Sequence, residues 1–72
     1  DIETLKEISI LFPELKNVSL GKHLINQNTD STQVMTVMLY QTSDKEKVDT
    51  KKIESWLNQK LKTKNIKLIQ QE

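Results

Sequence analysis

The segment formed by residues 34–40 is apolar on both sides of an extended chain, and this feature restricts the possible folds most. Successive side chains of a strand point to opposite faces. One face would carry the side chains of Val34, Thr36, Met38 and Tyr40, and the other face would carry those of Met35, Val37 and Leu39. Strands that are apolar on both faces are usually buried on both faces. The segment therefore predicts either a sheet covered on both sides or an exposed apolar patch that contains Met38 and Tyr40.

A helix and a strand are expected before this segment. Apolar residues recur at steps of three and four near the start of the chain, as in an amphipathic helix: Ile2, Leu5, Ile8, Leu11 and Phe12. Pro13 ends this helix, because a proline pushes the residue before it out of the helical region. Alternation then predicts a strand over residues 17–25, in which Gly21 marks a bulge or bend.

The remaining elements follow from turn residues and capping signals. Residues 26–32 are polar and turn-forming, so they predict a seven-residue loop that leads into a second, antiparallel strand over residues 34–41. After a polar connection over residues 42–47, Asp49 has the position of a helix N-cap, although Ser43 and Glu46 offer an earlier start. The buried stripe of the second helix is predicted to be Ile53, Trp56, Leu57 and Leu61. A short final strand is expected over residues 66–70.

The order α-β-β-α-β predicts a small α+β domain, in which two helices pack mainly on one face of a three-stranded mixed sheet. The 72 residues are expected to form a single domain. No cysteine and one histidine are present, so disulfides and a metal site are not available to stabilise it. No apolar run approaches the roughly 20 residues of a membrane span. The chain opens on a helical pattern without a methionine, which predicts a piece of a longer protein.

Few residues suit catalysis. Histidine is the commonest general base, and His23, with Asp30 as a partner, is the one candidate. The alternative is that His23 is a solvated residue at the edge of a strand and has no catalytic role. The single glycine, Gly21, excludes a glycine-rich phosphate loop and the two-glycine clamp of KH-type RNA binders.

Two carboxylate pairs, Glu3 with Glu7 and Asp44 with Glu46, fall on expected solvent faces or in a loop. Acid–base catalysis by two carboxyl groups needs an environment that distinguishes them, which a solvated surface does not provide. We therefore expect no enzymatic activity, no cofactor and no bound metal.

A surface remains as the candidate for function. The apolar residues Val34, Met38 and Tyr40 are predicted to form a contact face for a protein partner or a second copy of the chain. The domain is accordingly expected to be a non-enzymatic interaction, accessory or regulatory module of a larger protein.

A lysine-rich second helix supports an alternative of another class. In this alternative the domain binds a polyanion weakly, either a nucleic acid or an anionic lipid surface. The candidate binding residues are Lys51, Lys52, Lys60 and Lys62. All eleven basic residues are lysines. The absence of arginine argues against nucleic acid, because arginine is the residue that reads phosphate and guanine bidentately.

Two segments, residues 11–21 and residues 53–61, carry a family resemblance. They contain the runs Leu-Phe-Pro-Glu-Leu, Val-Ser-Leu-Gly and Ile-Glu-Ser-Trp-Leu. The chain resembles the soluble C-terminal segment of Bacteroidetes membrane proteins that carry the hydrophobic region called domain of unknown function 389. This resemblance implies an accessory domain tethered at the bacterial inner membrane, with membrane contact only through other parts of the protein. Frequent Lys, Ile and Asn also suggest an AT-rich bacterial genome.

Overall fold

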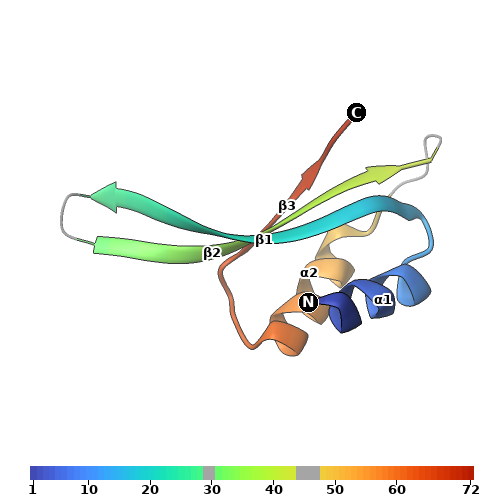
Figure 1. Ribbon diagram of the computed structural model, residues 1–72, viewed down its shortest axis with the longest axis horizontal. Coiled ribbons are helices and arrows are strands. Elements are labelled where there is room, and N and C mark those ends of the chain that lie inside the picture. Colours follow the sequence, from blue (N-terminus) through green and yellow to red (C-terminus); the bar gives the residue numbers. More distant parts are fainter. Residues whose placement is uncertain (29–30, 44–47) are drawn as a thin grey trace.

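The computed structural model describes residues 1–28, 31–43 and 48–72. It has five elements: α1 (Ile2–Leu11), β1 (Leu15–Asn28), β2 (Ser31–Thr42), α2 (Thr50–Leu61) and β3 (Ile66–Gln70). The three strands form one sheet in the order β1-β2-β3, with β1 antiparallel and β3 parallel to β2 (Figure 1). The predicted α+β fold and its order α-β-β-α-β are confirmed.

The first helix begins and ends where local chemistry favours it. The Asp1 carboxylate accepts a hydrogen bond of 2.8 Å from the Thr4 amide and caps the N-terminus, and Pro13 follows the C-cap residue Phe12. The buried stripe differs from the predicted one. Thr4 and Ile8 face the core, whereas Ile2 is 70% exposed. The helix is apolar around much of its circumference, so spacing alone does not fix the face that packs.

The second helix matches its sequence pattern more closely. Asp49 is the N-cap, as predicted, and its carboxylate accepts a hydrogen bond of 3.1 Å from the Lys52 amide. Ile53 and Leu57 are fully buried. At the other end the backbone of Lys62 adopts a left-handed conformation with φ of 54°, which closes the helix by a hydrogen bond from its amide to the Asn58 carbonyl.

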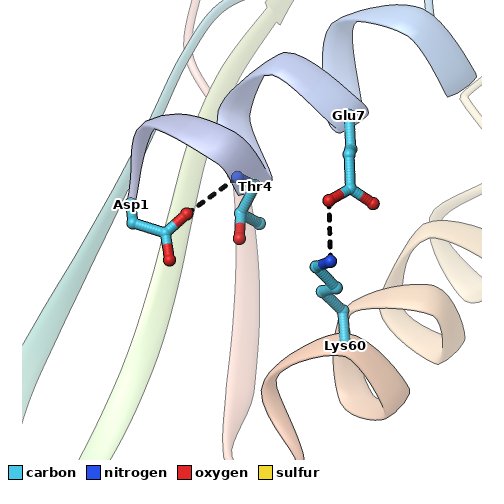
Figure 2. Close-up of polar contacts among 4 residues, drawn as sticks. All are labelled: Asp1, Thr4, Glu7 and Lys60. Atoms are coloured by element: carbon cyan, nitrogen blue, oxygen red, sulfur yellow. Dashed lines mark hydrogen bonds and ion pairs between the residues drawn. The ribbon is translucent and has the colours of Figure 1, made fainter.

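The core lies between the two helices and one face of the sheet. Both helices lie on the same side of the sheet (Figure 1). An ion pair of 2.6 Å between Glu7 and Lys60 joins them at the surface, beside the Asp1 cap (Figure 2). The buried apolar residues come from four elements or their ends: Ile8, Phe12, Leu15, Met38, Tyr40, Ile53 and Leu57.

The β1–β2 hairpin is longer than the sequence predicts. Pairing continues to Asn28 opposite Ser31, so most of the seven residues predicted as a loop belong to strands. Polar residues can pair in this way because a solvated hairpin needs no apolar side chain to complete its backbone hydrogen bonds. The end of the hairpin formed by residues 22–28 and 31–35, here called the arm, extends beyond the helices (Figure 1). The predicted bulge at Gly21 is wrong: Gly21 pairs regularly with Val37, and the register shifts lie at residues 16–19 and 25–28.

Candidate interaction surface

The two faces of β2 differ sharply in their surroundings. Met38 is 0% exposed and Tyr40 is 3% exposed, because both side chains point toward the helices and join the core. The prediction that they lie on an exposed contact face is therefore wrong. The sequence pattern shows two apolar faces on this strand, but it does not show from which side the helices approach. The structure places the uncovered face on the opposite set of residues.

This uncovered face, here called the open face, has an apolar line along its centre. Met35, Val37 and Leu39 of β2 form the line, and none of them belongs to the helix-side core or packs against it. They are partly buried, because side chains of the flanking strands reduce their exposure to solvent. The line is the part of the two-sided strand that no described helix or strand covers.

The flanking strands complete the open face. On the β1 side, Ser19, Gly21 and His23 lie opposite Leu39, Val37 and Met35, respectively. On the β3 side, Lys67 and Ile69 lie opposite Val37 and Leu39. The face therefore has an apolar centre, with one more apolar side chain at Ile69 and polar groups around it. Many protein contact surfaces also have an apolar centre and a polar rim.

The imidazole of His23 lies close to Gly21 on this face. A Cβ atom at position 21 would lie 3.6 Å from Nε2 of His23, so the ring lies along the strand over the glycine. His23 is exposed, and its proposed partner Asp30 lies outside the described residues. Within the described part of the chain, no group of three or more His, Cys, Asp or Glu residues could hold a metal ion.

Charge is distributed unevenly between the sheet and the rest of the chain. Across the described strands there is no Asp or Glu, whereas three lysines occur in them: Lys16, Lys22 and Lys67. Lys67 lies at the β3 edge of the open face, opposite Val37, and Lys16 lies at one end of the face, opposite Gln41. Glu72, the last residue, lies at that same end, where its backbone oxygen accepts a hydrogen bond of 3.1 Å from the Gln41 side chain.

Val34 occupies a different surface from the open face. Its side chain is 50% exposed and lies on the helix side of the arm, opposite Leu24, which is 76% exposed. Val34 lines a shallow hollow of about 380 Å³ with Leu20 and Leu61, and Asp1 and Lys22 also line it. Of the three predicted contact residues, only Val34 is therefore accessible, and it does not lie beside Met38 and Tyr40 at the surface.

The four lysines of the polyanion alternative do not share one surface. Lys60 pairs with Glu7. At 3.6 residues per turn, Lys51 and Lys60 project about 180° apart around the helix axis. Lys62 lies beyond the last residue of α2. The structure therefore separates these charges instead of gathering them into a patch.

The carboxylate pairs likewise form no catalytic arrangement in the described residues. Glu3 is exposed, and Glu7 is engaged with Lys60. Asp44 and Glu46 lie outside the described residues. Among the described helices, none is long and apolar enough to cross a membrane.

A comparison with protein families matches residues 2–71 to the family described as Domain of unknown function (DUF8492). The chain belongs to this family. The match to DUF8492 adds no support for a relationship with the proteins that carry domain of unknown function 389, so that resemblance stays a prediction. Searches of curated proteins and of solved structures found no match.

Sequence reasoning chose the wrong face of β2, although the signal for the right one is present in the neighbouring strands. Residues that pair with Met38 are Leu20 and Leu68, both apolar. Residues that pair with Val37 are Gly21 and Lys67. Once the register is known, the face with apolar neighbours on both sides is the one that the helices cover.

Proposed function

We propose that this domain is a non-enzymatic protein-interaction module that binds its partner through the open face. The observation that supports the proposal is the apolar line of Met35, Val37 and Leu39, which runs along the central strand and is not covered by any other element in the described part of the chain. A central strand with apolar side chains on both faces is usually covered on both faces. A partner that covers the line would remove apolar surface from water, which is the main favourable contribution to association.

The proposal includes a role as an accessory or regulatory unit of a larger bacterial protein anchored in the inner membrane. The support for this part is the resemblance carried by residues 11–21 and 53–61. The alternative of polyanion binding has less support, because Lys60 is paired with Glu7 and projects about 180° away from Lys51 around the helix axis.

Site-specific photo-crosslinking tests the interaction. A photoreactive phenylalanine analogue at Val37 is expected to link the domain to one defined protein in cells of the source organism. The same analogue at Lys51, on the exposed face of α2, is the control and should not give that product. Absence of any product specific to position 37 would count against the proposal.

Binding of the identified partner is then measured by calorimetry with purified proteins. Val37→Asp should abolish the heat of binding, because it places a carboxylate in the apolar line. Leu24→Asp is the matched control, since it makes the same kind of change at an exposed apolar residue on the other side of the hairpin. Equal loss of binding in the two variants would show that the open face is not the site.

A further inference from the structure

We infer that the partner presents to the open face an amphipathic α-helix whose apolar stripe is flanked by carboxylates. The inference rests on the proposed function and specifies the chemistry of the partner. It is carried by the juxtaposition of the apolar line with Lys67 and by the absence of acidic residues from the described strands.

The charges argue first against a second copy of this chain. Lys67 lies opposite Val37, and among the described residues it forms no ion pair. If the open faces of two copies packed together about a two-fold axis, each face would meet an identical one. Lys67 of both copies would then enter one contact layer, and no strand would supply a carboxylate to it. Like charges that are brought together in this way select against an association.

The same charges favour an acidic partner. Carboxylates flanking an apolar surface could face Lys67 on the β3 side, while the apolar centre covers Met35, Val37 and Leu39. Complementary charges at the rim of a contact orient the partner and speed its association. They contribute selectivity, whereas the apolar centre contributes most of the affinity.

The dimensions of the face fit one helix. Strands about 4.8 Å apart place β1 and β3 about 10 Å from each other, which is close to the 10–12 Å diameter of a helix. The apolar line spans four residue steps, or about 13 Å. Apolar residues at positions i, i+4 and i+7 of a helix span about 10.5 Å. Two helical turns therefore cover the line, and the flanks of the helix lie over the two outer strands.

Two synthetic helical peptides of 18 residues test the inference with the full 72-residue chain. Both carry the same apolar stripe of leucines; the flanking positions are glutamate in one and lysine in the other. Backbone amide chemical shifts report both affinity and location. The glutamate peptide is expected to shift the amide signals of residues 35–39 and 66–70. At low salt it should bind about tenfold more tightly than the lysine peptide, because the lysine peptide replaces charge attraction at the flanks with repulsion. This preference should shrink at high salt.

A charge reversal provides the second readout. Lys67→Glu should remove the preference for the glutamate peptide or reverse it, whereas Lys51→Glu, an equal charge change on the far side of the molecule, should leave the preference intact. Equal affinities for the two peptides, tighter binding of the lysine peptide, or shifts confined to α1 and α2 would overturn the inference.

The two proposals can fail separately. The inference about the acidic helix is overturned if the partner crosslinks at Val37 but neither peptide binds. It is also overturned if the segment of the partner that contacts Val37 is an extended strand or is basic. In both cases the proposed interaction function stands. If no partner links at Val37, the proposed function fails as well.

Discussion

The two faces of β2 have similar apolar content and opposite surroundings. Met38 and Tyr40 lie under two helices and are almost completely buried, whereas Val37 and Leu39, their immediate neighbours along the chain, lie on a face without a covering layer. Burial in this domain therefore depends on how the helices are placed over the sheet more than on the side chains of the strand itself. Substitutions on the two faces should separate folding from binding.

The largest expected effect is that of Met38→Asp. A carboxylate in a fully buried site without a partner should lower the free energy of unfolding by more than about 4 kcal/mol, which approaches the total stability of a small domain. Circular dichroism during thermal unfolding should show a largely unfolded chain at 25 °C. A cooperative transition close to that of the wild type would contradict the assignment of Met38 to the core.

Leu57→Ala should have the next largest effect and would examine the helix that covers this face. Leu57 is fully buried, so its truncation should cost about 2–5 kcal/mol through lost apolar contact and the remaining cavity. Urea unfolding measures the loss. Leu24→Ala is the control, because Leu24 is 76% exposed on the arm and its truncation should change stability by less than about 0.5 kcal/mol. Similar losses in both variants would mean that the helix side is not the main core.

Val37→Asp should destabilise the fold far less than Met38→Asp, although the two residues are adjacent. Its carboxylate remains in contact with water on the open face and lies opposite Lys67, so we expect a loss of about 1 kcal/mol. Urea unfolding of both variants under one set of conditions gives the comparison directly. A loss equal to that of Met38→Asp would show that the open face is buried in solution.

Glu7→Gln should have the smallest effect. It removes the ion pair with Lys60 that joins the two helices, but both side chains are 39% exposed, so solvent screens the pair. We expect a change below about 0.5 kcal/mol by urea unfolding. A loss above 1 kcal/mol would assign to this pair a structural role that its exposure does not support.

Much of the fold follows from local sequence patterns. The bounds of β3, the cap at Asp49 and the stripe of Ile53 and Leu57 rest on short-range rules, and the structure confirms them. The stripe of α1 was less predictable, because Ile2 has the same apolar character as Ile8 and only packing distinguishes them. The length of the hairpin also escaped prediction, since polar residues form backbone pairs as well as loops.

The candidate site could also be predicted only in part, because it depends on contacts between residues that are far apart in the sequence. The two-sided strand predicted that one apolar face could be left uncovered, but the predicted contact residues Val34, Met38 and Tyr40 all lie on the helix side. The choice between Met38 and Val37 depends on which residues of β1 and β3 lie beside each of them. This register involves residues 16 to 30 positions away in the sequence, so the periodicity of one segment does not contain it.

The arm formed by residues 22–28 and 31–35 has a consequence for local opening. β3 pairs with Thr36–Tyr40, and beyond this pairing a side-chain hydrogen bond of 3.5 Å from Asn65 reaches the Val34 carbonyl at the base of the arm. Most of the arm is therefore paired only between its own two strands, and a two-stranded hairpin is only marginally stable by itself. Its described amides should exchange with solvent deuterium sooner than those of residues 36–40, without unfolding of the helix-covered half. We therefore expect the hairpin to divide into a protected part beside β3 and an arm that opens first, with the boundary where β3 begins its pairing.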